Sequence, residues 1–73
     1  MREFRIRQYG RTELALLYSP DITPKAAWKK LQQWISYHPQ LPLTLRRLGY
    51  DARRQRIFTP AQVEAIVEAI GEP

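Results

Sequence analysis

The clearest hydrophobic pattern of the chain lies near its C-terminal end. Four apolar residues there follow the i, i+3, i+4, i+7 repeat of an amphipathic helix: Val63, Ile66, Val67 and Ile70. Thr59-Pro60 provides an N-cap followed by proline in the first turn, where its missing N–H costs no hydrogen bond, and Gly71 follows the last apolar position. The pattern predicts a helix over residues 60–70 with Glu64 and Glu68 on its exposed face.

A second helix pattern opens with the same Thr-Pro pair, at Thr23 and Pro24, and extends to about Ser36. One face of this helix is apolar and comprises Ala27, Trp28, Leu31, Trp34 and Ile35. The outer face is basic and polar and comprises Lys25, Lys29, Lys30, Gln32 and Gln33. A small domain needs large side chains to bury enough area, so we expect the aromatic residues in the core, with at most one tryptophan as a surface anchor.

Two shorter helices are predicted. The first runs from about Glu13 to Tyr18 with Thr12 as its N-cap, and its core face comprises Leu14, Leu17 and Tyr18. The second runs from Leu43 to Leu48 and ends at Gly49, which suits a left-handed C-terminal cap. In this helix Leu45 and Leu48 are expected to point inward, and Arg46 and Arg47 outward.

Strand signals are brief. Residues 3–7 alternate charged and apolar side chains, with Phe4 and Ile6 on one face, which predicts a short strand. Residues 50–58 contain a basic, polar stretch that ends in Ile57-Phe58, and this pattern fits either a small hairpin or an extended loop ending in a strand. We therefore predict one mainly α domain over residues 1–73, with a helix-turn-helix and a short β strand or wing hairpin.

Charge is distributed unevenly along the chain. Residues 1–58 hold twelve bases and four acids, giving +8, whereas residues 59–73 hold three acids and no base, giving −3, so that the total is +5. A basic surface attracts phosphate backbones without specific contacts, which favours a polyanion as the partner. The alternative, that this charge only keeps a small domain in solution, remains open.

The residues that usually carry catalysis are sparse. There is no cysteine, and the single histidine, His38, precedes a proline in a predicted loop without a neighbouring carboxylate. The three glycines are isolated, so no glycine-rich phosphate loop is present. We expect no enzyme activity, cofactor or metal. The apolar stretches are too short for a membrane span or a signal peptide, so we expect a cytoplasmic protein.

Two stretches of the sequence resemble MerR/excisionase-type winged-helix domains. These are Tyr-Gly-Arg-Thr-Glu-Leu-Ala-Leu-Leu-Tyr at residues 9–18 and Arg-Ile-Phe-Thr-Pro-Ala-Gln-Val-Glu-Ala-Ile at residues 56–66. The resemblance implies that residues 24–36 form a recognition helix and that residues 51–56 form a wing that contacts phosphates. The chain departs from that pattern in a longer turn at residues 19–22, in the lack of a turn glycine, and in extra residues before the wing.

Nearly the whole chain also resembles a family of short bacterial proteins that is classed as a domain of unknown function. The Tyr-Gly-Arg-Thr-Glu-Leu-Ala opening and the Phe-Thr-Pro-Ala-Gln-Val ending carry this resemblance. It implies an independent small domain and brings no activity or ligand with it.

These observations predict double-stranded DNA as the partner, bound through a helix-turn-helix and a small wing. The expected contact residues are Lys25, Lys29, Lys30, Gln32, Arg53, Arg54 and Arg56. The competing expectation is a protein-interaction module whose basic surface meets an acidic protein. The oligomeric state and the target sequence are left open.

Overall fold

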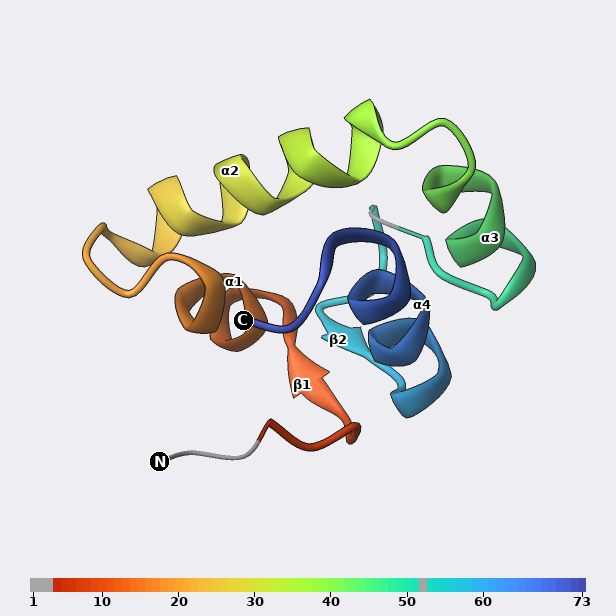
Figure 1. Ribbon diagram of the computed structural model, residues 1–73, viewed down its shortest axis with the longest axis horizontal. Coiled ribbons are helices and arrows are strands. Elements are labelled where there is room, and N and C mark those ends of the chain that lie inside the picture. The colour runs from red at the N-terminus through yellow and green to blue at the C-terminus, as the bar shows by residue number, and fades with distance from the viewer. Residues whose placement is uncertain (1–3, 52) are drawn as a thin grey trace.

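The computed structural model describes residues 4–51 and 53–73 of the chain. These residues form four helices and two short strands (Figure 1), in the order β1 (Tyr9–Gly10), α1 (Arg11–Tyr18), α2 (Pro24–Tyr37), α3 (Leu41–Arg47), β2 (Ile57–Phe58) and α4 (Pro60–Ile70). The predicted class, a small and mainly helical domain with a little β structure, is confirmed.

The two strands join distant parts of the chain. β1 and β2 pair antiparallel, with Tyr9 opposite Phe58 and Gly10 opposite Ile57. The pairing continues into the first turn of α1, where the Arg11 N–H donates to the Arg56 carbonyl at 2.9 Å. Of the two arrangements predicted for residues 50–58, the described residues fit the loop that ends in a strand, although this loop contains a turn at residues 53–54; Ala52 lies outside the described residues. The partner strand comes from the N-terminal part of the chain.

The strand predicted over residues 3–7 is wrong for residues 4–7, which form no strand; Glu3 lies outside the described residues. The β-structure begins at Tyr9 because β2 is only two residues long and pairs with Tyr9 and Gly10. Phe4 instead stacks on the Tyr9 ring at 5.4 Å, and the Ile6 side chain is exposed. The alternation of residues 3–7 therefore does not mark a buried strand face.

The start of α1 is also corrected, because its N-cap is Gly10 and Thr12 lies inside the helix. Glu13 then occupies the third helical position, and its carboxylate accepts a hydrogen bond from the Gly10 N–H at 3.1 Å. The Arg7 guanidinium donates to the other carboxylate oxygen at 3.0 Å. The hydrogen bond from Arg7 and, to a smaller extent, the one from the Gly10 N–H lower the pKa of Glu13.

Helix α1 packs chiefly against α2, and its Leu14 and Ala15 are fully buried. Leu17, predicted on the core face, is 37% exposed, because the buried face of α1 is centred on residues 14 and 15. Helix α2 follows the prediction closely: the Thr23 hydroxyl caps it by accepting from the Ala26 N–H at 3.2 Å. Its Ala27 and Leu31 are buried, whereas Trp28, Trp34 and Ile35 are half-buried.

Helix α3 begins two residues earlier than predicted, at Leu41, and ends at Arg47. Pro42 lies in its first turn, where proline removes no helical hydrogen bond, so this proline does not delay the helix as expected. Leu41 and Leu45 are buried, and Leu48 is exposed rather than inward. The predicted glycine cap is confirmed: Gly49 has φ +87°, its N–H donates to Arg46, and the Tyr50 N–H donates to Leu45.

All six elements contribute to one core. Its buried apolar members are Tyr9, Leu14, Ala15, Ala27, Leu31, Leu41, Leu45, Phe58, Val63 and Ile66.

Helix α4 matches its predicted bounds and cap, with the Thr59 hydroxyl accepting from the Gln62 N–H at 3.3 Å. The buried Gln62 side chain also accepts from the Thr59 N–H and donates to the Leu48 carbonyl, each at 3.0 Å, and so connects the end of α3 to the start of α4.

A substitution at Ile66 tests whether the predicted apolar face of α4 is buried. Its side chain is fully buried, so Ile66→Ala should lower the free energy of unfolding by about 2 to 5 kcal/mol. Ile22→Ala is the matched control, because Ile22 lies in the turn before α2 and is 40% exposed. Thermal or urea unfolding measures both variants. Equal, small losses would contradict the inward orientation of Ile66.

Tyr18 generates a prediction for alkaline pH. Its hydroxyl donates to the Gly71 carbonyl, and burial raises its pKa to about 12, with a smaller contribution from the charge of Glu72. A raised folded-state pKa favours the folded protein below the unfolded pKa of about 10, and this stability is lost as pH rises through the folded value. Melting temperature should therefore fall between about pH 10 and 12, and fall less steeply in Tyr18→Phe.

Candidate nucleic-acid interface

The seven residues predicted to contact DNA are all exposed, and they come from two segments of the chain. Lys25, Lys29, Lys30 and Gln32 belong to α2, and Arg53, Arg54 and Arg56 belong to the loop before β2. Among the described residues the ion pairs are Arg7–Glu13 and Arg54–Asp51. Most of the predicted cations therefore have no carboxylate partner in that part of the chain.

The structure separates the α2 residues into two groups. Lys25, Lys29 and Gln32 follow i, i+4, i+7 spacing and form one stripe along the helix. Lys30 is on a different side, because its Nζ lies 5.3 Å from the centre of the Trp34 ring. The stripe consisting of Lys25, Lys29 and Gln32 is therefore one side of the exposed polar face of α2.

Asp51 organises the following residues of the loop, as far as they are described (53–55). Its side-chain oxygen Oδ1 accepts from the Arg53 N–H at 3.0 Å, and its carbonyl accepts from the N–H groups of Arg54 and Gln55 at 3.1 and 2.8 Å. An aspartate that bonds the backbone two residues ahead is a common way to form a turn. The turn leaves the side chains of Arg53 and Arg54 exposed.

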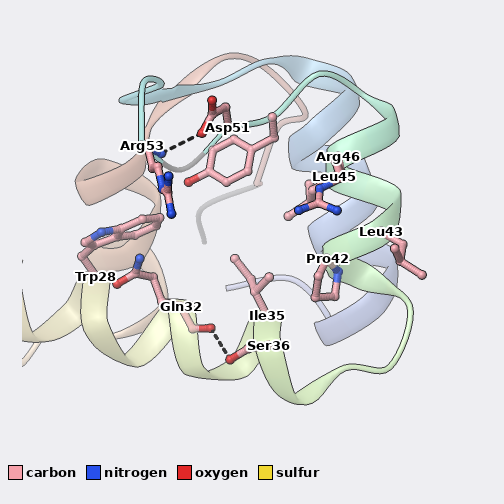
Figure 2. A pocket seen from close by; sticks show the side chains of 11 residues that line it. Trp28, Gln32, Ile35, Ser36, Pro42, Leu43, Leu45, Arg46, Asp51 and Arg53 are labelled. Carbon is pink, nitrogen blue, oxygen red and sulfur yellow. Dashed lines mark hydrogen bonds between the residues drawn. The ribbon is translucent and has the colours of Figure 1, made fainter.

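The loop meets α2 at a cleft of about 790 Å³. Figure 2 shows Arg53 extending from the loop towards Trp28 and Gln32, while Arg46 and Pro42 of α3 form the opposite wall. Gln32 therefore belongs both to the polar stripe of α2 and to this cleft. Among the predicted contact residues, the cleft brings together Gln32 and Arg53, whereas Lys30 lies over the Trp34 ring.

Tyr50 and Arg46, which were not among the predicted contact residues, also line the cleft. The Tyr50 ring stacks on the buried Phe58 ring, with centroids 4.8 Å apart. Its hydroxyl is buried and has no hydrogen-bond partner within the described residues, and burial raises its pKa. In the sequence, Gly49 indicated only that a helix ends before Tyr50. It did not indicate the orientation of the tyrosine side chain.

Each tryptophan borders a different cavity. Trp28 packs against Phe58 at 6.0 Å and carries Arg11 over its ring at 5.1 Å, and its remaining surface lines the cleft. Trp34 contacts Tyr18 edge to face at 5.9 Å, in a shallower groove that also includes the exposed Tyr37. Both tryptophans pack against the core while keeping part of their surface accessible.

The remaining candidate groups lie elsewhere. His38 is in the loop after α2, where its Nδ1 accepts from the Gln40 N–H at 3.4 Å. No three His, Cys, Asp or Glu side chains gather into a metal-binding group within residues 4–51 and 53–73. Glu64 and Glu68 are exposed on α4, as predicted. The helices of the described residues are too short or too polar to cross a membrane.

Residues 5–73 match the model of a family described as a domain of unknown function, DUF4248. The match covers essentially the whole chain. No curated protein and no solved structure shows a significant match.

The unpartnered hydroxyl of Tyr50 generates a prediction for the protein without ligand. A buried polar group without a hydrogen bond lowers stability, so Tyr50→Phe should leave the melting temperature unchanged or raise it slightly. Tyr9→Phe is the control, because the Tyr9 hydroxyl donates to the Arg5 carbonyl at 2.9 Å and its loss should be destabilising. Destabilisation of Tyr50→Phe comparable to the control would show that the hydroxyl has a partner in the free protein.

Proposed function

Because the chain belongs to the DUF4248 family, whose description names no activity, we propose a function from its geometry: it binds double-stranded DNA through a helix-turn-helix. In this proposal α1 and α2 are the two helices, α2 is the recognition helix, and residues 51–56 act as the wing. The domain binds DNA in the cytoplasm and is not an enzyme.

The proposal is supported chiefly by one observation: α2 and the loop, which meet at the cleft, each carry exposed cations without a carboxylate partner among the described residues. Lys25 and Lys29 share a side of α2, and Arg53 reaches the same helix at Gln32. A duplex presents two rows of phosphates beside a groove, so cations on two adjacent elements can contact both. Gln32, between them, carries an amide that can hydrogen-bond base edges.

The position of Lys25 gives independent support. It lies in the first turn of α2, near the positive end of the helix dipole, and that turn contains no acidic residue. A cation there opposes the dipole, so local helix stability does not explain it. Both the lysine and the helix N-terminus favour an approaching phosphate.

The competing proposal is an interaction module that binds an acidic protein through the same surface. Exposed cations suit either partner, and the salt dependence of binding distinguishes the two. Duplex binding releases condensed counterions, so log K should fall with log salt by about 0.9 for each phosphate contacted. The slope and its response to variants therefore report the kind of partner.

The test is a titration of random-sequence duplex with the protein at two or more salt concentrations. Lys25→Ala/Lys29→Ala and Arg53→Ala/Arg54→Ala should each weaken binding and flatten the salt slope by up to about two. Melting temperatures should change little, because exposed charges contribute little to stability. If the protein does not bind duplex at low salt, or if neither double variant alters binding, the DNA proposal fails and the acidic partner is favoured.

The neighbouring lysines of α2 provide a matched control. Lys29→Ala and Lys30→Ala remove the same charge from the same helix, but Lys30 lies over the Trp34 ring, away from the stripe. We expect Lys29→Ala to reduce the slope by about one and Lys30→Ala to change it much less. Equal effects of the two variants would indicate attraction by net charge alone rather than binding at the α2 stripe.

A further inference from the structure

The cleft between α2, α3 and the loop contains groups that lack partners within residues 4–51 and 53–73, and together these groups indicate the chemistry of a ligand. We propose that this cleft binds one nucleotide unit, a planar base with its phosphate, supplied either by an unpaired nucleotide of a bound DNA strand or by a free nucleoside monophosphate. The strand form of this inference rests on the proposed function, because the strand must first dock on α2.

The hydroxyl of Tyr50 defines the polar end of the site. It is buried without a hydrogen-bond partner among the described residues. The stacking of its ring on Phe58 at 4.8 Å and the hydrogen bond from its N–H to the Leu45 carbonyl at 2.9 Å hold the residue in place. Because the hydroxyl is buried, a ligand atom reaches it only when a covering side chain moves aside, and the hydrogen bond then formed would offset that rearrangement.

Two arginines at the cleft indicate that the ligand is anionic. Arg46 comes from α3 and Arg53 from the loop, so their guanidinium groups approach from different walls (Figure 2). Neither forms an ion pair with the described residues, since the nearby Asp51 pairs with Arg54 and accepts from the Arg53 backbone. Guanidinium groups bind phosphate well, and this site therefore needs no glycine-rich loop.

The walls of the cleft favour a planar body for the ligand. Trp28 presents an aromatic surface, and Ile35 and Leu45 continue the apolar lining. Aromatic side chains stack on bases of any sequence. The volume of about 790 Å³ falls within the range of small-ligand sites, about 300 to 1,000 Å³.

The cleft is also placed to receive a nucleotide from a strand on α2. Gln32 lines it and belongs to the stripe with Lys25 and Lys29. A phosphate backbone that follows this stripe would pass the mouth of the cleft. A base without a pairing partner can leave the stack at low cost and enter a pocket of this kind.

The experiment compares a fully paired duplex with the same duplex carrying one unpaired 2-aminopurine, whose fluorescence decreases on stacking. We expect the second duplex to bind about 10-fold more tightly, with quenched fluorescence. Tyr50→Phe and Arg46→Gln should each reduce this preference by about 3- to 10-fold and leave binding of the paired duplex unchanged. Neither residue belongs to the α2 stripe or the proposed wing.

Adenosine monophosphate, titrated in a Trp34→Phe background so that Trp28 reports alone, distinguishes the two sources. Quenching that is weakened by Tyr50→Phe and Arg46→Gln, without any preference for the unpaired base, would support the site with a free nucleotide as its ligand. That outcome would hold even if duplex binding failed, and would then overturn the proposed function alone.

Persistent duplex binding with neither effect would overturn the cleft proposal and leave the proposed function standing. If nothing binds, both proposals fail. The melting temperatures of the variants serve as the folding control, and Tyr50→Phe is expected to melt no lower than the parent.

Discussion

The antiparallel pairing of β1 with β2 is the interaction on which the arrangement of the domain depends. Each strand has only two residues, and their pairing joins Tyr9–Gly10, just before α1, to Ile57–Phe58, just before α4. The pairing places the start of α1 beside the end of the basic loop, and buries Phe58 between the helices. Because Phe58 in turn supports Trp28 and Tyr50, the same few residues position both the core and the cleft.

The sequence predicted the helices best where capping and periodicity agreed. Both Thr-Pro starts were located correctly, and so was the glycine cap at Gly49. The errors occurred where a partner distant in sequence decides the outcome. β1 lies at Tyr9–Gly10 because β2 pairs there, and α1 begins at Arg11 because its first N–H bonds to Arg56. A pattern read along one segment does not contain this information.

In the candidate site, too, local patterns predicted some features and contacts between distant segments decided the others. Exposure of the cations on α2 followed from helical periodicity, since the residues opposite Ala27 and Leu31 must face solvent. The cleft could not be predicted, because it arises where three segments meet and depends on the orientation of Tyr50 and Arg46. Likewise, the distinction between Lys29 and Lys30 required the position of Trp34.

The aromatic residues show how a small core and a binding surface share the same side chains. Trp28 and Tyr50 cover Phe58 with one part of their rings and line the cleft with another. A domain of this size buries only about 60% of the surface of its unfolded chain, so most of its large side chains must contribute to the core even when they also line a binding site. Substitutions at Trp28 would thus affect stability and ligand contact together, whereas removal of the Tyr50 hydroxyl alone avoids this overlap.

The separation in sequence of the two strands also has a consequence for how the protein forms during synthesis. Helices α1 and α2 are adjacent in the chain and can associate early, but β1 has no partner until β2 has been made. Closing so long a loop costs entropy that only the later packing of Phe58 and α4 offsets. Folding on the ribosome should therefore be a late and concerted event, and a nascent chain that stops before β2 would expose the apolar faces of its first helices to chaperones and proteases.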